Sequence, residues 1–199
     1  MQHTNPHLHH EQLTLALKFS GESTNGNILN CTLCSSDSAV LYQISTPDAP
    51  ASRTTIRGVP NNEEVGVLDK KGLLSIQSRE YFPVGGILES GTTFQFSNGK
   101  RYTWKHHSSS GKTILMTSIK PHATIATYTT RYIDNKSPTL EISNSSTGPT
   151  TNEIITTLVY TERCRQDSYS TRIKKWVLAP QPRVTGRGVG LDVGWAVRW

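Results

Sequence analysis

The sequence lacks the features that mark membrane-spanning, secreted and disulfide-rich proteins. No apolar run approaches the roughly 20 residues that a membrane-spanning helix needs. The N-terminus has neither the basic leader nor the long apolar core of a signal peptide. There are three cysteines, an odd and small number that argues against a disulfide scaffold. We therefore expect a cytoplasmic protein, with peripheral contact to a membrane as the closest association with lipid.

Motifs for metal, nucleotide and nucleophilic chemistry are also incomplete. Cys31 and Cys34 have the spacing of half a zinc site, but no second half follows at matching spacing. Residues 110–113 (SGKT) end like a phosphate-binding loop, yet His106 stands where that loop needs a glycine. The G-x-S-x-G motif of many hydrolases is absent. We expect no metal and no cofactor, and a binding module is favoured over an enzyme.

The charge is unevenly distributed along the chain. Residues 169–199 hold six basic and one acidic side chain, a net charge of +5, whereas residues 1–168 hold fifteen basic and fourteen acidic ones, a net charge of +1. Duplex-binding proteins usually carry a basic face on the folded domain itself. A nearly neutral body with a basic tail therefore does not indicate a nucleic-acid partner.

Short alternating segments dominate the chain, which is rich in Thr, Ser, Ile, Val and Tyr. This composition and spacing predict about ten strands separated by turns. The predicted strands lie at 13–20, 28–34, 39–45, 53–57, 65–68, 73–78, 92–96, 100–105, 113–119, 122–133 and 139–143. Residues 83–91 (PVGGILESG) are typical of a loop.

The clearest local signal is a hairpin around Asn98-Gly99, because both residues tolerate the positive φ of a tight turn. Phe94 and Phe96 alternate on the first strand, and Tyr102 and Trp104 share a face of the second. This pattern predicts an aromatic inner face and places Lys100 on it. Arg101 and Lys105 then fall on the opposite face.

Residues 150–167 (TTNEIITTLVYTERCRQD) are the best candidate for a helix. Thr150 and Glu153 have the spacing of a capping box, and apolar residues follow at helical intervals. Ile, Val and Thr are poor helix formers, so such a helix needs tertiary packing around it. The alternative is a buried strand over ITTLVY. Residues 170–178 (STRIKKWVL) could pair as an edge strand or lie on a surface.

A long meander followed by a late apolar helix predicts an all-β fold with one main helix. We expect an antiparallel, closed or nearly closed barrel of about 10–12 strands around that helix, since closure removes exposed sheet edges. The predicted organisation is a polar, His-rich segment at 1–20, a barrel domain at 21–178 and an irregular basic tail at 179–199.

Several segments together resemble an uncharacterised domain family of basidiomycete fungi. They are the opening hairpin ending in LYQISTP, the TTIRGV strand, the FSNGKRYTWK hairpin and the apolar helix running into ERCRQD, and the resemblance covers roughly residues 26–168. The motif that carries it consists of Phe96, Asn98, Gly99, Lys100, Arg101, Tyr102, Trp104 and Lys105. That family is similar in predicted architecture to the tubby C-terminal domain, the plant LURP-one proteins and the phospholipid scramblases, which are twelve-stranded barrels around a hydrophobic helix.

The resemblance implies a fold but does not assign a site. Tubby proteins bind phosphoinositide head groups in a basic pocket on the barrel, and the positions of that pocket do not transfer legibly to this sequence. The residues themselves suggest a basic patch, for which a solvated strand face is the alternative. The candidate anion- or lipid-binding residues are Lys100, Arg101, Lys105 and Lys112 on the meander, with His106 and His107 beside them, and Lys174 and Lys175 near the tail.

The leading functional hypothesis is a non-enzymatic binding module for an anionic phospholipid head group or a protein partner. One alternative is a hydrolase or transferase whose site is assembled by loops, and another is an oligomerising interaction scaffold. The ligand and the oligomeric state do not follow from the sequence.

Overall fold

The computed structural model describes residues 12–19, 28–47, 53–69, 73–85, 91–130, 138–143 and 148–177. In these residues, thirteen strands form one antiparallel sheet and a single helix follows them. The elements are β1 (Gln12–Phe19), β2 (Cys31–Cys34), β3 (Val40–Ser45), β4 (Thr54–Gly58), β5 (Glu63–Leu68), β6 (Leu74–Ile76), β7 (Arg79–Tyr81), β8 (Pro83–Gly85), β9 (Thr92–Gln95), β10 (Arg101–His107), β11 (Lys112–Thr117), β12 (Thr124–Thr129), β13 (Thr139–Ser143) and α1 (Thr151–Val177).

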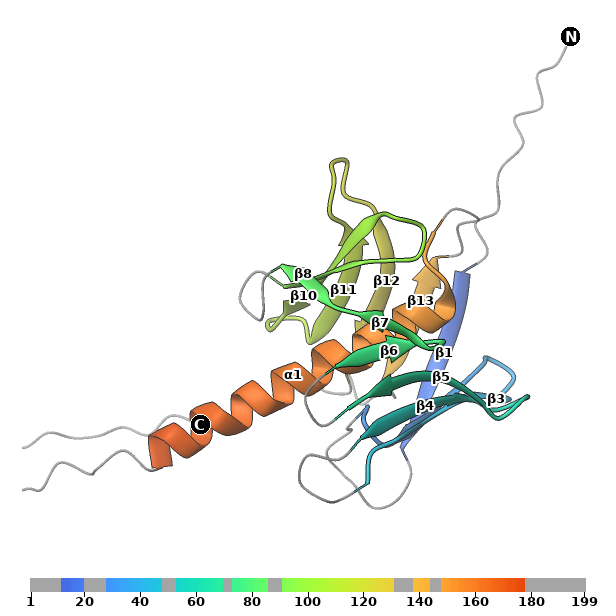
Figure 1. The fold of residues 1–199 in the computed structure, drawn as a ribbon, viewed down its shortest axis with the longest axis horizontal. Helices are drawn as coiled ribbons and strands as arrows, with labels where there is room; N and C mark the ends of the chain where they lie inside the picture. The colour runs from blue at the N-terminus through green and yellow to red at the C-terminus, as the bar shows by residue number, and fades with distance from the viewer. Residues whose placement is uncertain are drawn as a thin grey trace, which may run out of the picture.

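The sheet curls into a nearly closed barrel (Figure 1). Its strand order is β7-β6-β5-β4-β3-β2-β1-β13-β12-β11-β10-β9-β8, so the two end strands, β7 and β8, are consecutive in the chain. Phe82 alone separates them, which brings the two edges of the sheet together. The predicted fold class is confirmed. The structure has thirteen strands where 10–12 were expected. The difference arises because β7 and β8 have only three residues each, and β8 lies in a segment whose sequence is typical of a loop.

The helix fills the barrel, as predicted. Thr150 and Glu153 form the capping box: Thr150 N donates to Glu153 Oε2 at 2.9 Å, and Glu153 N donates to Thr150 Oγ1 at 3.3 Å. Every residue from 153 to 160 is buried, whichever side of α1 it lies on. A helix buried all round needs a surrounding core, and the sheet supplies it. The alternative of a buried strand over ITTLVY is therefore wrong.

The helix continues past its predicted end at 167 to Val177. The alternative of an edge strand at 170–178 is wrong for the part through Val177, which is helical. The physical reason is visible in the sequence, because neither proline nor glycine interrupts residues 151–177. Figure 1 shows the last turns of α1 projecting away from the barrel.

The aromatic hairpin forms the centre of the core. Phe94, Phe96, Tyr102 and Trp104 are all buried, and the rings of Phe96 and Tyr102 stack at 4.9 Å between centroids. Trp104 Nε1 donates to Thr157 Oγ1 on the helix at 3.0 Å. The predicted faces of this hairpin are therefore correct for its aromatic side chains.

The first strand belongs to the barrel. β1 pairs with β2 on one side and with β13 on the other, so residues 12–19 are part of the sheet even though the predicted domain boundary stands at residue 21. The predictions for the His-rich start at 1–11 and for the tail at 179–199 lie outside the described residues.

Candidate anion-binding site

Residues 91–130, which contain β9 to β12, form a segment that we call the basic meander. They contain no Asp or Glu over their whole length. Their five Lys and Arg residues are Lys100, Arg101, Lys105, Lys112 and Lys120. The rest of residues 1–168 then holds 15 − 5 = 10 basic and 14 acidic side chains, a net charge of −4. The nearly neutral body thus consists of a basic part and an acidic part.

The basic side chains of β10 and β11 lie on the outer face of the barrel. Tyr102 and Trp104 point inward, so the alternating residues Arg101 and Lys105 point outward, as the sequence predicts. Arg101 is exposed and Lys105 is half-buried. Lys112 pairs with His107 across the strands, which makes Lys112 a diagonal neighbour of Lys105 on the same outer face.

The candidate residues do not converge on one point. Arg101 begins β10 and His107 ends it, a separation of about 20 Å along the strand. Lys100 is exposed in the turn before β10 and does not join the aromatic face on which alternation placed it, because the strand begins only at Arg101. Lys112 belongs to the opposite end of the strand pair.

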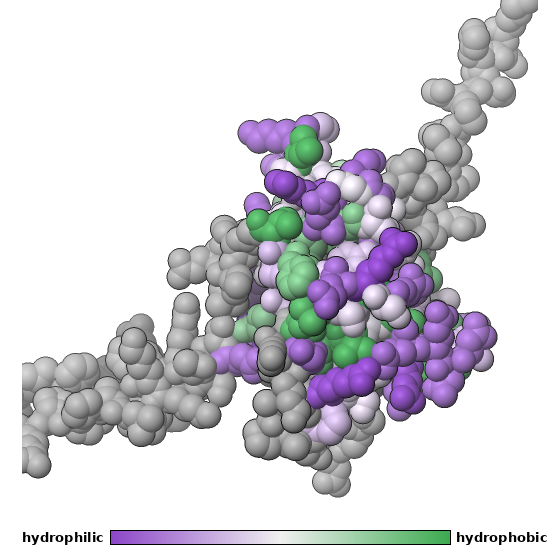
Figure 2. All heavy atoms as spheres, in the orientation of Figure 1, coloured by the Kyte–Doolittle hydropathy of each residue, from purple (hydrophilic) through white to green (hydrophobic). Residues whose placement is uncertain are grey.

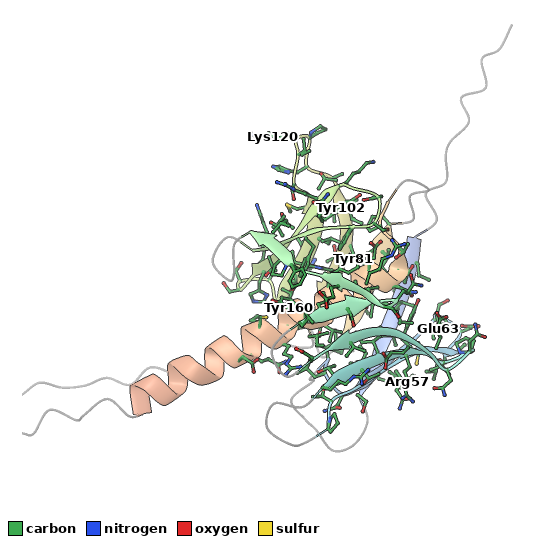
Figure 3. The ribbon with its side chains drawn as sticks, viewed as in Figure 1. Arg57, Glu63, Tyr81, Tyr102, Lys120 and Tyr160 are labelled. Atoms are coloured by element: carbon green, nitrogen blue, oxygen red, sulfur yellow. The ribbon has the colours of Figure 1, made fainter. Side chains whose placement is uncertain are left out.

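Two ends of the basic meander can therefore be distinguished. The first end contains Lys100 and Arg101, and the loop between β11 and β12 lies beside it because Ser118 N donates to Arg101 O at 3.0 Å. That loop carries Lys120, which is exposed and sits at its tip (Figure 3). The second end contains Lys112, and it approaches the part of α1 around Arg165.

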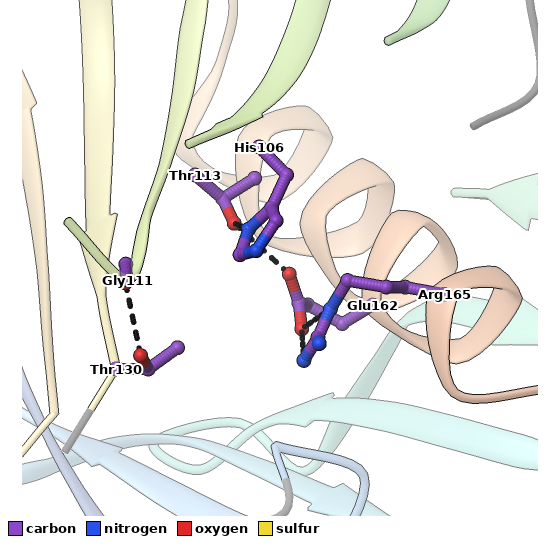
Figure 4. Close-up of polar contacts among 6 residues, drawn as sticks. All are labelled: His106, Gly111, Thr113, Thr130, Glu162 and Arg165. Carbon is purple, nitrogen blue, oxygen red and sulfur yellow. Dashed lines mark hydrogen bonds and ion pairs between the residues drawn. The ribbon is translucent and has the colours of Figure 1, made fainter. Parts of the chain in front are cut away.

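At the second end, a hydrogen-bonded chain joins the meander to the helix (Figure 4). Thr113 Oγ1 donates to Glu162 Oε1 at 3.0 Å, and Arg165 donates through Nε and Nη2 to Glu162 Oε2 at 2.9 and 2.7 Å. His106 Nδ1 lies 3.1 Å from Thr113 Oγ1. Because the single hydroxyl proton of Thr113 points to Glu162, His106 donates from Nδ1, and its Nε2 is the acceptor in the neutral ring.

Two features limit the positive charge of the second end: the lowered pKa of His106 and the ion pair between Glu162 and Arg165. Burial lowers the pKa of His106, and the nearby Arg165 guanidinium lowers it further, against the opposite effect of Glu162. Glu162 is 2 % exposed and neutralises Arg165 directly. The pair of Glu162 and Arg165 therefore adds no net charge to the second end, where Lys112 and its diagonal neighbour Lys105 are the remaining Lys and Arg side chains of the basic meander.

The first end has no such compensation. Ion pairs within the described residues join Arg53 to Glu64 and Arg165 to Glu162, and none of the five Lys and Arg residues of the basic meander takes part in one. Glu153 is the carboxylate nearest to this end in the hydrogen-bond network, since it accepts from Ser97 N at 2.6 Å. It is buried inside the barrel at 2 % exposure and forms no ion pair with a cation among the described residues.

Lys174 and Lys175 lie in the projecting part of α1. They follow Arg165 by about 14 Å along the helix axis and so belong beyond the second end. The structure does not bring them together with Lys100 and Arg101.

Other kinds of site have less support in the described residues. These residues contain no group of three or more His, Cys, Asp or Glu side chains arranged to hold a metal ion. Cys31 and Cys34 are strand residues, as expected, and burial together with the neighbouring Cys34 raises the pKa of Cys31 to about 12. Among the same residues, no helix has both the length and the apolar character needed to cross a membrane.

Sequence reasoning identified four residues of the meander but missed Lys120 and Arg165. Lys120 stood outside any strand pattern, and Arg165 belonged to the polar end of the predicted helix. The absence of carboxylates over residues 91–130 was the signal that could have outlined the whole face.

Comparison with known protein families gives one match. The model of a family of unknown function, DUF6593, matches residues 26–167, and the chain belongs to that family. Searches among curated proteins and among solved structures found no match. The likeness to tubby-type barrels stays a prediction.

Proposed function

We propose that the domain is a non-enzymatic binding module that attaches to anionic phospholipid head groups through its basic meander. The observation that carries this proposal is a 40-residue segment without a carboxylate, whose five Lys and Arg side chains form no ion pair within the described part of the chain. This function fits a cytoplasmic protein that associates reversibly with a membrane surface.

The strength of such attachment follows from the number of charges. A basic residue close to an anionic bilayer contributes about 1 kcal/mol, and the attraction decays within a Debye length. Three to five cations on one face would therefore give roughly millimolar binding that weakens as salt is added. Lys174 and Lys175 could add to this attraction if the projecting helix also reached the surface.

Vesicle co-sedimentation tests the proposal. The variant Lys100→Glu/Arg101→Glu/Lys120→Glu reverses three exposed charges at the first end of the basic meander. The control Lys18→Glu/Arg57→Glu/Arg79→Glu reverses three exposed charges elsewhere on the barrel, so the two variants have the same net charge. We expect wild type and control to sediment with vesicles that contain phosphatidylserine, and the meander variant to stay in the supernatant.

Two results would contradict the proposal. One is an absence of binding by the wild-type protein at low salt. The other is an equal loss in both variants, which would show that net charge rather than the meander determines binding. Unchanged binding of Lys174→Glu/Lys175→Glu would remove the projecting helix from the interaction.

The enzymatic alternative has one point of support, the imidazole of His106. Its orientation by Thr113 and Glu162 would suit a general base that accepts a proton at Nε2. No nucleophile among the described residues is hydrogen-bonded to that nitrogen, so we favour the binding module. A protein partner with an acidic surface would use the same cations and would appear as binding that vesicles do not reproduce.

A further inference from the structure

The loop between β11 and β12 presents an apolar side chain to solvent. Ile119 is 75 % exposed, more than any other large hydrophobic residue in the described part of the chain. The next most exposed is Phe82 at 58 %, which lies at the junction of the two sheet edges. Leaving an isoleucine in water forgoes the free energy that its burial would provide, so a protruding one indicates a contact surface.

The loop has a defined shape. Thr117 and Ala123 close its base, with Thr117 N donating to Ala123 O at 3.0 Å and Ala123 N donating to Thr117 Oγ1 at 2.9 Å. His122 Nδ1 donates to Thr117 O at 2.8 Å. Side-chain bonds of this kind fix a turn that lacks regular secondary structure. Ile119 is thus held outward by a hydrogen-bonded base.

Cations surround this apolar tip. Lys120 follows Ile119 directly, and the bond from Ser118 N to Arg101 O places Arg101 at the foot of the loop. Lys100 precedes Arg101 in the adjoining turn. In Figure 2 the protruding tip at the top of the molecule combines hydrophilic and hydrophobic side chains, and Figure 3 labels Lys120 there.

We propose that this loop enters the interfacial layer of an anionic bilayer, where Ile119 contacts the apolar chains and the ammonium and guanidinium groups of Lys100, Arg101 and Lys120 contact the phosphates. An anionic bilayer offers negative charge at its surface and apolar chains about 5–10 Å deeper. The loop offers a matching pair of groups, with Arg101 at its foot, Ile119 exposed near its tip and the long side chain of Lys120 beside it, which can reach back toward the phosphates. The inference rests on the proposed function and assigns the first end of the basic meander as the end that faces lipid.

The fold then fixes the orientation of the whole domain. The helix starts at the first end, because Glu153 in its first turn accepts from Ser97 N. It passes Glu162 at the second end and leaves the barrel there. The projecting part of α1 therefore points away from the bilayer, and reversal of Lys174 and Lys175 should leave vesicle binding unchanged.

The test compares Ile119→Ser with Val59→Ser. Val59 is 41 % exposed in the turn between β4 and β5 on another part of the barrel, so both changes remove one exposed aliphatic side chain. Sedimentation uses vesicles of phosphatidylcholine with phosphatidylserine at low and at physiological salt. We expect Ile119→Ser to weaken binding roughly tenfold at physiological salt, and Val59→Ser to leave it unchanged.

A second measurement reports the depth of the loop directly. Ile119→Cys and Val59→Cys, each combined with Cys164→Ala, are labelled with an environment-sensitive fluorophore. Cys31 and Cys34 are buried and do not compete for the label. We expect vesicles to blue-shift the emission from position 119 and to leave that from position 59 unchanged.

The outcomes separate this inference from the proposed function. Vesicle binding by wild type that Ile119→Ser retains in full, with unshifted emission at position 119, would overturn the inference and leave the proposed function standing. No binding by wild type to anionic vesicles at low salt would overturn both. Equal binding to vesicles of phosphatidylcholine alone would refute the role of the cations.

Discussion

Two parts of the same sheet differ in the charge of their side chains. Residues 31–81, which contain β2 to β7, have five basic and six acidic side chains, and Arg53 donates to both carboxylate oxygens of Glu64 at 3.0 and 2.9 Å. We call this part the mixed-charge half. The basic meander has five basic side chains and no carboxylate. Figure 3 shows Arg57 and Glu63 together in the mixed-charge half, far from Lys120 in the meander.

The inner faces of the two parts are alike. Each alternates apolar residues toward the helix, such as Ile56 and Leu68 in the mixed-charge half and Phe94 and Leu115 in the meander. Burial against α1 determines this face in both. The outer face is not constrained by the core, so a difference in charge there costs the fold little and points to function. The comparison also teaches that a small net charge can conceal a strongly basic surface.

The largest expected effect comes from the residue that ties both parts to the helix. Glu153 Oε1 accepts from Tyr81 Oη of the mixed-charge half at 2.9 Å and from Ser97 N of the meander. Its Oε2 accepts from Thr150. Glu153→Gln would set an amide N–H₂ against one pair of donors, so we expect a loss of about 3 kcal/mol in the free energy of unfolding. Urea titration measures it.

The matched control is Glu64→Gln, which removes a carboxylate from an exposed ion pair and should cost less than about 1 kcal/mol.

The pH dependence of stability provides a further check. Burial alone would raise the pKa of Glu153, but the bonds from Ser97, Thr150 and Tyr81 outweigh it and lower the pKa below 4.5. Its stabilisation is therefore complete above pH 4.5 and is lost as the pH falls through the folded-state pKa. Wild type and Glu153→Gln should therefore converge in the free energy of unfolding as the pH falls.

A smaller effect is expected where the mixed-charge half meets the helix. A Cβ added at Gly66 would overlap Thr156 Cγ2, whereas one at Gly58 would lie 3.5 Å from Val65 Cγ2, an ordinary contact. Thr156 is β-branched and buried in the helix, so it cannot rotate away freely. We expect Gly66→Ala to cost about 2 kcal/mol and Gly58→Ala to be nearly neutral in thermal unfolding. Equal melting temperatures of the Gly66→Ala and Gly58→Ala variants would disprove the close approach of Gly66 to Thr156.

The basic meander contacts the helix through the hydrogen bond from Trp104 to Thr157. Comparing substitutions at Thr157 and at the adjacent Thr156 measures the contribution of this bond. Thr157 Oγ1 accepts from Trp104 Nε1 and donates to Glu153 O at 2.7 Å. The hydroxyl of Thr156, also buried, has no hydrogen-bond partner among the described residues. Thr157→Val should cost about 1.5 kcal/mol because it leaves the indole N–H unpaired, and Thr156→Val should be neutral or slightly stabilising. The reverse ranking in denaturant titrations would refute the assignment of partners.

Local patterns predicted the parts of the fold that local interactions determine. Asn98-Gly99 defined a hairpin, and Gly99 does adopt a positive φ of 74°. The capping box at Thr150 located the helix start. The helix end was harder to predict, since β-branched and charged residues after 167 also suit a strand. The three-residue strand β8 depends on pairing with β9 and carries no pattern of its own.

The candidate site was predicted in composition but not in arrangement. Arg101, Lys105 and Lys112 do share one strand pair, with Lys100 in the turn before it, yet register places Arg101 and Lys112 at opposite ends. Glu162 and Arg165 stand three residues apart on α1, but the burial of Glu162 beside Thr113 depends on the packing of α1 against β11. The exposure of Ile119 depends on the bonds within its loop. Tertiary contacts of this kind have no signature in a single sequence.

The most direct test of the central claim is hydrogen–deuterium exchange of the whole protein with and without phosphatidylserine vesicles. It reads both parts of the sheet in one experiment. We predict slower exchange at residues 97–101 and 117–123 of the basic meander, with no change at 57–64 of the mixed-charge half. Protection confined to the mixed-charge half, or spread equally over both, would contradict the account.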